Sequence, residues 1–221
     1  MRGNGGKYEK NIVIVATGSG VRQHVAYEFG KHEMREILVA RNEDHLKKYQ
    51  QELQSQQIEC HYKMADFAQR ETLTQAFEKI QYEFGTVDVL LYNAAVLKPQ
   101  SASRLTSSYL MKCYQIDVAS AAHCVQLVLD QQKKQHSGTI LFTGGGFGIN
   151  PVHEYSTVSI GKASLRALAL MLHEELKEQG IYVVILHIMG TVAPHTYYDP
   201  HDIAQKFYSM YCQRDGGEYQ F

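Results

Sequence analysis

The chain has 221 residues, of which 44% are hydrophobic and 20% charged, and its formal net charge is -1. These values are ordinary for a globular α/β domain, and the near-neutral charge argues against nucleic acid or an anionic membrane as a partner. No apolar run in the sequence approaches the length that would span a bilayer.

The start of the chain and the cysteines bear on the cellular compartment. Residues 1–10 are polar, so we expect a flexible tail and no secretory signal there. Cysteines are far apart in the sequence and form no Cys-x-x-Cys pair, which predicts reduced thiols in a cytoplasmic protein. The four cysteines are Cys60, Cys113, Cys124 and Cys212.

Strand and helix patterns alternate through the first half of the chain. Apolar residues recur there at helical spacing between short runs typical of strands, and Gly85 ends the third of these helices as a C-cap. The strands are expected at 11–16, 36–40, 58–63 and 87–92, and the helices around 21–29, 46–53 and 73–84.

The second half repeats this alternation. Gly138 and Gly180 are expected to end its first two helices. Strands that alternate with helices pair in parallel through right-handed crossovers. We therefore predict an α/β fold, a doubly wound Rossmann-type parallel sheet of about seven strands with helices on both faces, as one dinucleotide-binding domain over 1–221. The strands of this half are expected at 139–143 and 181–187, and its helices at 118–129, 162–177 and 200–211.

The glycine turn after the first strand is the first candidate binding site. Gly18 and Gly20 stand where a strand meets a helix, so exposed N–H groups and the positive helix end can hold a dinucleotide pyrophosphate there. Ala16 and Arg22 replace glycines that this motif usually has. A tight turn with no ligand is therefore the alternative interpretation.

Arg41 follows the second strand at the position where an acidic residue would hold the ribose hydroxyls of NAD. Arginine suits the extra phosphate of NADP instead, and Arg22 in the turn would add a second positive group. Ala40-Arg41 also argues against a methyltransferase, which would prefer an acidic residue at this point. The alternative for Arg41 is a solvated helix N-terminus.

Motifs further along the chain carry a resemblance to a known family. Together with the order of elements, these motifs resemble the short-chain dehydrogenase/reductase family over nearly the whole chain, from about Lys10. The resemblance implies NADP(H) as the cofactor, with NAD as the alternative. The motifs are Met64-Ala65-Asp66-Phe67, Tyr92-Asn93-Ala94-Ala95, Ser159-Ile160-Gly161-Lys162 and Met189-Gly190-Thr191-Val192.

Four cofactor contacts are implied by this resemblance. Asp66 would bind the adenine amino group, and Asn93 would support the sheet and line the cofactor. Lys162 would hold the nicotinamide ribose, although an exposed helix lysine is the alternative reading. The backbone at Val192 would meet the nicotinamide amide.

The catalytic set departs from the family pattern. A tyrosine four residues before the lysine is replaced by Val158, a serine after the fifth strand by Gly145, and an asparagine by Asp117. Lys162 is thus the one member retained, and valine cannot transfer a proton. Tyr155 is the candidate substitute, but on a continuous helix it would lie about 10.5 Å along the axis from Lys162. A partly buried aromatic at the helix entry is the alternative.

Two functions follow from these residues. The first is an NADP(H)-binding oxidoreductase that acts on a small carbonyl or alcohol substrate and takes its proton from water or Tyr155. The alternative is a catalytically inactive cofactor-binding protein that acts as a sensor or an interaction partner. The short segment 190–199, where the family carries a substrate lid, implies an open, shallow or missing substrate pocket.

Two further expectations concern metals and assembly. His195, Asp199, His201 and Asp202 form a local cluster, but their spacing matches no ligand pattern, so we expect a solvated loop and no metal. Family members pair their long helices across a two-fold axis, which implies a homodimer or homotetramer. Residues that would add apolar surface to such a face are Cys113, Leu127, Leu170 and Met171.

Overall fold

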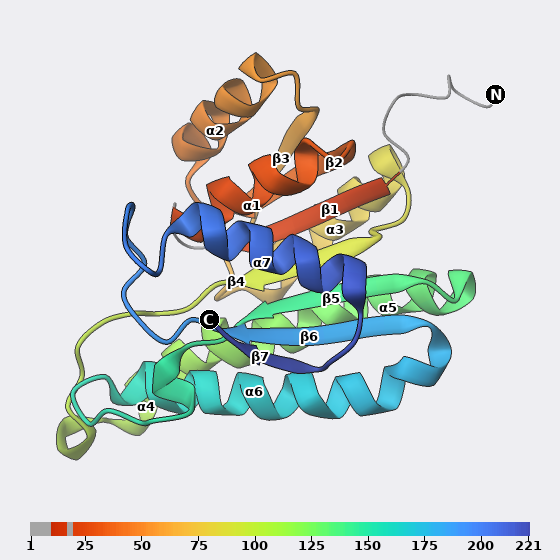
Figure 1. The fold of residues 1–221 in the computed structure, drawn as a ribbon. Helices are drawn as coiled ribbons and strands as arrows, with labels where there is room; N and C mark the ends of the chain where they lie inside the picture. The colour runs from red at the N-terminus through yellow and green to blue at the C-terminus, as the bar shows by residue number, and fades with distance from the viewer. Residues whose placement is uncertain (1–9, 17–19) are drawn as a thin grey trace.

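Seven strands form one parallel sheet in the order β3-β2-β1-β4-β5-β6-β7 (Figure 1). The computed structural model describes residues 10–16 and 20–221, so the predictions for the tail before Lys10 and for Gly18 lie outside the described residues. Lys10 itself was expected in the tail but begins the first strand. The strands are β1 (Lys10–Ala16), β2 (Met34–Ala40), β3 (Cys60–Met64), β4 (Val89–Asn93), β5 (Gly138–Thr143), β6 (Ile181–His187) and β7 (Glu218–Gln220).

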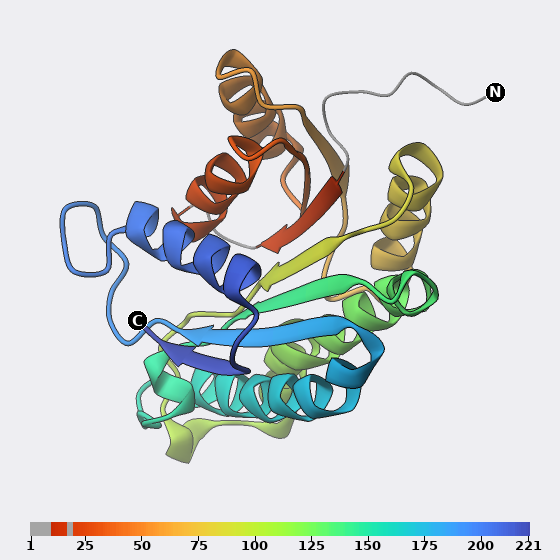
Figure 2. The same cartoon turned by 45° about the vertical axis from the view of Figure 1, so that its right-hand side comes forward.

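The strand order reverses between β1 and β4. The chain builds β1, β2 and β3 outward on one side, then returns to pair β4 on the other side of β1. Because the pairs are all parallel, the carboxyl ends of the strands lie along the same edge, where the arrowheads point in Figure 2. In such sheets ligands bind at this reversal of strand order.

Helices cover both faces of the sheet, which confirms the doubly wound α/β prediction (Figures 1 and 2). The first two α-helices and the last one cover one face, and the third, fifth and sixth cover the other. The helices are α1 (Gly20–Gly30), α2 (Glu43–Ser55), α3 (Arg70–Phe84), α4 (Ser107–Tyr114), α5 (Ser120–Gln135), α6 (Ser156–Leu176) and α7 (Pro200–Gln213). The short turns are η1 (Ala102–Arg104), η2 (Gln115–Ala119, a π-turn), η3 (Gly146–Gly148) and η4 (Lys177–Gln179).

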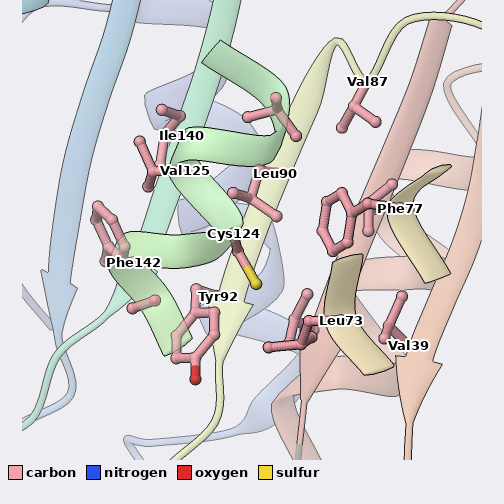
Figure 3. Close-up of a cluster of buried hydrophobic side chains, with 14 of the residues drawn as sticks. Val39, Leu73, Phe77, Val87, Leu90, Tyr92, Cys124, Val125, Ile140 and Phe142 are labelled. Atoms are coloured by element: carbon pink, nitrogen blue, oxygen red, sulfur yellow. The ribbon is translucent and has the colours of Figure 1, made fainter. Parts of the chain in front are cut away.

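The core on the face of α3, α5 and α6 anchors the central strands. Leu73 and Phe77 from α3 and Cys124 from α5 meet the side chains of β4 and β5 between helices and sheet (Figure 3). These side chains are fully buried, and the strands are buried on both faces, as parallel strands require. This packing fixes the strand ends that carry the candidate site.

Helix boundaries differ from the predictions in two places that matter for the site. α6 begins at Ser156, six residues before the expected start at Lys162, so it contains the whole motif around the lysine. α5 does not end at Gly138 as expected, because His136 already adopts a left-handed conformation (φ 48°) and Gly138 begins β5. Gly180 caps the following turn as predicted.

The residues expected to add apolar surface for assembly have mixed positions. Cys113 is buried and Leu127 packs against the core, whereas Met171 is 63% exposed on α6. Assembly through this face stays a prediction. No helix within residues 10–16 and 20–221 has the length and apolarity to cross a membrane.

Candidate active site

Two of the predicted cofactor residues meet where β2 and β3 end. Arg41 Nη1 lies 4.0 Å from Asp66 Oδ1, and the arginine side chain is 60% exposed. Asp66 is held in place because its Oδ1 accepts the N–H of Ala68 (3.0 Å) and its own N–H donates to Thr72 Oγ1 (2.9 Å). The pair therefore presents a positive and a negative group side by side at the carboxyl edge.

Arg22, the second expected phosphate contact, lies elsewhere. It is 4% exposed on α1, and its guanidinium carbon lies 4.5 Å from the centre of the Tyr49 ring of α2. Burial lowers the pKa of Arg22, and its Nε has no hydrogen-bond partner. This placement ties Arg22 to the packing of two helices and does not favour a phosphate contact.

The turn into α1 meets the segment after β6. An ideal Cβ on Gly20 would lie 3.9 Å from Val192 Cγ1, so these two predicted contacts are neighbours. Asn93 ends β4 and is paired in register with Ala16, the last residue of β1. The structure thus brings Gly20, Asn93 and Val192 to the reversal of strand order.

A glycine run after β5 lies tightly between α6 and the end of β6. An ideal Cβ on Gly144 would lie 2.4 Å from His187 Nδ1, and one on Gly148 would lie 2.8 Å from the Lys162 carbonyl carbon. Any side chain at those two positions would therefore clash. Gly145, at the family's serine position, is different, because nothing lies closer than 3.9 Å to its ideal Cβ.

Lys162 is a buried lysine at the end of β5. It is 8% exposed on α6, and its Nζ donates to the carbonyl of Thr143 at the end of β5 (2.5 Å). The reading as an exposed helix lysine is therefore wrong. Burial lowers the pKa of Lys162 to about 8, against the opposing effect of the Asp117 carboxylate.

Asp117 lies in the π-turn between α4 and α5. It is 1% exposed, its Oδ1 accepts the N–H of Val96 (2.7 Å), and its Oδ2 has no hydrogen-bond partner. Burial raises the pKa of Asp117 to about 6, while the Val96 N–H and Lys162 lower it. Short π-helical segments such as η2 are often found at functional sites.

The candidate substitute for the missing tyrosine stands at the entry of α6. Tyr155 precedes the first helical residue, and its ring stacks on that of Phe147 at 5.2 Å between centroids. This matches the interpretation as a partly buried aromatic at the helix entry. Val158, four residues before Lys162, is buried at 3% exposure. Both nearby serines have local structural bonds, Ser156 to the Gln100 carbonyl and Ser159 to the Val152 backbone.

The histidine and aspartate cluster near α7 has a capping role. Asp199 accepts the backbone N–H groups of His195 (2.6 Å) and His201 (2.9 Å), which lowers its pKa and starts the helix. In the described part of the chain, no three His, Cys, Asp or Glu side chains gather in a way that would hold a metal ion.

Sequence reasoning missed a network behind the glycine run. The Gly145 N–H donates to His187 Nδ1 (3.3 Å), and His187 Nε2 donates to Glu218 Oε1 (2.9 Å). Glu218 on β7 also accepts from Arg166 on α6 (Nη2 to Oε2, 3.1 Å). His187 is fully buried, and burial lowers its pKa. The signal available in the sequence was a histidine that ends an otherwise apolar strand.

Sequence comparison shows the family of this chain and several relatives. The model of the short chain dehydrogenase family matches residues 10–200. Human short-chain dehydrogenase/reductase 3 is 26% identical over 133 residues, covering 60% of this chain and 44% of the relative. The 17-beta-hydroxysteroid dehydrogenase type 3 of Rattus norvegicus is 25% identical over 190 residues, covering 84% and 61%. The chain thus spans roughly half the length of these curated relatives.

Solved structures share the fold. An alcohol dehydrogenase from the archaeon Thermococcus sibiricus, complexed with 5-hydroxy-NADP, matches with a TM-score of 0.84 and 20% identity, covering 96% of this chain and 94% of that one. A metagenomic short-chain oxidoreductase in complex with NADP matches with a TM-score of 0.87 and 17% identity, covering 97% and 96%. With the family match over 10–200, the chain belongs to the short-chain dehydrogenase family.

Proposed function

We propose that this chain binds NADP(H) along the carboxyl edge of its sheet and catalyses hydride transfer to or from a small carbonyl or alcohol substrate. The observation that carries the proposal is Lys162, a buried lysine held by the Thr143 carbonyl at that edge. Burying an ammonium group costs free energy, so a lysine kept there without a surface role points to a ligand contact. Three solved structures that share the fold are complexes with 5-hydroxy-NADP, NADP or NADPH, which supports the same class of cofactor here.

Residues at both ends of the carboxyl edge, around Arg41 and around Lys162, fit the cofactor. Arg41 offers an exposed guanidinium, a group that binds phosphate through two parallel hydrogen bonds, beside the Asp66 carboxylate for an amino group. Buried polar atoms without partners, Thr143 Oγ1 and Asp117 Oδ2, belong to the residues around Lys162. The glycine at position 20 leaves room beside Val192.

When bound, NADPH supplies a hydride, so the chain has to place the substrate carbonyl and provide one proton. Lys162 would hold the ribose hydroxyls through the Nζ hydrogens that Thr143 leaves free. The substrate oxygen or a water molecule would lie near Gly145, where the family pattern has a serine hydroxyl and where an ideal Cβ would make only ordinary contacts. Water or Tyr155 would deliver the proton, since Val158 has no group that can.

The test is NADPH consumption with a panel of small aldehydes and ketones, followed by absorbance at 340 nm. Turnover that is lost in Lys162→Met and kept in the exposed-lysine control Lys112→Met supports the proposal. Tight NADPH binding without turnover on any substrate would favour the second candidate, a cofactor-binding protein without chemistry. That candidate rests on the replacements at Val158 and Gly145.

A further inference from the structure

The middle residue of the glycine run after β5 depends on a side chain for its hydrogen bond. The N–H groups of Gly144 and Gly146, on either side of it, donate to backbone carbonyls at the end of β6 and just after it (2.8 and 3.0 Å). The Gly145 N–H donates to Nδ1 of His187 instead (3.3 Å). In the part of the chain that the structure describes, the imidazole is thus the acceptor for this N–H.

Gly145 lies between this histidine and the retained lysine. An ideal Cβ on Gly145 would lie 3.9 Å from Lys162 Cγ, so the residue is a neighbour of the lysine side chain. His187 ends β6 and is fully buried. Its ring comes so close to the glycine run that an ideal Cβ on Gly144 would lie 2.4 Å from Nδ1. The imidazole therefore supports the run from the side away from solvent.

The far side of the imidazole is held by two charged residues. Its Nε2 lies 2.9 Å from Oε1 of Glu218 on β7. Glu218 also accepts two N–H groups of Arg166 from α6, of which the bond from Nη2 to Oε2 is 3.1 Å long. The hydrogen bond from Arg166 lowers the pKa of Glu218, so the carboxylate is ionised at pH 7 and can only accept. Nε2 must therefore carry a proton.

The two neighbours of the ring require the same form of His187. A backbone N–H is always a donor, so Nδ1 has to be free of a proton to accept from Gly145. Burial lowers the pKa of His187, while the charge of Glu218 opposes this effect and Arg166 is the remaining charged group that faces the ring. The neutral Nε2–H tautomer satisfies both contacts, whereas an imidazolium would place a second N–H against that of Gly145.

We propose that His187 is a positioning residue that holds the Gly145 peptide in place beside the point where the substrate oxygen would lie. Glu218 and Arg166 in turn hold the imidazole in its Nε2–H form, so β7 supports the site as well. The role toward substrate rests on the proposed function, whereas the hydrogen bonds are a property of the protein without cofactor. A displaced peptide would misplace the substrate oxygen and leave the nucleotide contacts unchanged.

The first experiment determines the tautomer of His187 in the protein without cofactor. The chain is labelled with ¹⁵N, and the ring nitrogens are observed by long-range ¹H–¹⁵N NMR at pH 7. A nuclear Overhauser contact with the Gly145 amide proton identifies the ring, so this step needs no variant. We expect a neutral imidazole with its proton on Nε2. A proton on Nδ1, or a doubly protonated ring, would overturn the inference, since such a ring cannot accept from Gly145.

Two variants of equal size then test whether the acceptor holds the peptide. His187→Asn keeps an oxygen acceptor near the place of Nδ1, and His187→Leu has a similar shape with no acceptor. The leucine variant should speed hydrogen exchange of the Gly145 amide about tenfold, while the asparagine variant stays near wild type. The Gly146 amide, bonded to the backbone, is the internal control. Equal acceleration of both amides in the leucine variant would reveal a loss of overall stability and contradict a specific hold on Gly145.

Turnover with NADPH connects the peptide to the reaction. His187→Leu should lower the turnover number about tenfold with an unchanged Kd for NADPH, and His187→Asn should recover most of the loss. Equal turnover in wild type and His187→Leu would overturn the positioning role. No turnover by the wild type on any substrate contradicts the proposed function, and the tautomer and exchange results then decide whether His187 holds Gly145. If neither variant folds, the wild-type tautomer is the deciding result.

Discussion

The two ends of the sheet's carboxyl edge differ in the residues that they present. At the ends of β2 and β3, the exposed Arg41 lies 4.0 Å from the partly buried Asp66. At the end of β5, Lys162 and Asp117 are both buried, and the nearby positions 145 and 158 hold glycine and valine. The first end presents an exposed positive group beside a carboxylate, whereas the second combines a buried lysine with two residues that cannot transfer a proton.

The two ends therefore differ in what their charges do for the fold. An ion pair with this exposure contributes little to stability, so folding gains little from Arg41 and Asp66 as a pair. Burying charged groups such as Lys162 and Asp117 costs desolvation free energy. We therefore expect substitutions at the Lys162 end to have the larger consequences.

Restoring the lost groups is the change with the largest expected effect. Gly145→Ser with Val158→Tyr should raise NADPH-dependent carbonyl reduction by at least about 100-fold, the usual worth of a positioned general acid. The serine has space, since nothing lies within 3.9 Å of its Cβ position, and the tyrosine would face Lys162 one helical turn away. Gly145→Ala with Val158→Phe adds the same bulk without hydroxyl groups and should show no gain. A gain in both double variants would contradict the role given to the hydroxyls.

Removing the retained lysine comes next in size. Lys162→Met should raise the Kd for NADPH by about 10- to 100-fold, because a charge-assisted hydrogen bond to the ribose is lost. Isothermal titration calorimetry measures this, with Lys112→Met on the exposed face of α4 as the control. Equal Kd values for wild type, Lys162→Met and Lys112→Met would show that Lys162 does not contact the cofactor.

A buried acid near the start of β2 predicts an effect on stability. Glu36 lies in β2 at 0% exposure, neither of its carboxyl oxygens has a partner, and burial raises its pKa well above the ordinary 4.5. The folded state therefore holds the proton more tightly than the unfolded chain, so stability falls as pH rises above 4.5. Glu36→Gln should remove this fall and be about 1–3 kcal/mol more stable than wild type at pH 8.

Urea denaturation at pH 5 and pH 8 checks this prediction, with Glu78→Gln on the exposed side of α3 as the control. A wild-type stability that is equal at the two pH values would show that Glu36 is ionised or paired in the folded protein. The strand β2, which leads to Arg41, would then contain a buried negative charge.

The smallest expected effect is at the helix entry. Tyr155→Phe should change the Kd for NADPH and the turnover number by less than about twofold, because Tyr155 precedes α6 and its place in the sequence is roughly two helical turns before Lys162. The stacking on Phe147 survives the change, so the fold is kept. A loss of turnover of tenfold or more with unchanged Kd would make Tyr155 the proton donor.

The sequence predicts the sheet and half of the site. Its strand patterns are dense in β-branched residues, and the sixth strand has the predicted bounds, Ile181–His187. The sequence and its family resemblance assign Gly20, Val192, Arg41 and Asp66 each to a cofactor contact, and the structure brings Gly20 beside Val192 and Arg41 beside Asp66. These depend on strand order, which alternation of strands and helices determines.

Local patterns could not reveal what depends on packing between distant segments. Arg22 follows a glycine turn like a phosphate contact, yet it is buried against Tyr49 of the next helix. Asp117 reads as a replaced asparagine, and its burial against α6 depends on the π-helical segment η2 and on Gly161, which has no side chain to keep the two apart. β7 has three residues and pairs with β6 alone, too short a pattern to predict.

The most direct test of the account is a fluorescence titration of the purified chain with NADPH and with NADH. We predict tighter binding of NADPH, and an increase of about tenfold in its Kd in Arg41→Ala that leaves NADH unchanged, because the arginine would bind the extra phosphate. Arg104→Ala, an exposed arginine on η1, should behave as wild type. Binding of neither nucleotide, or equal binding of both with no effect of Arg41→Ala, would contradict the nucleotide end on which the account rests.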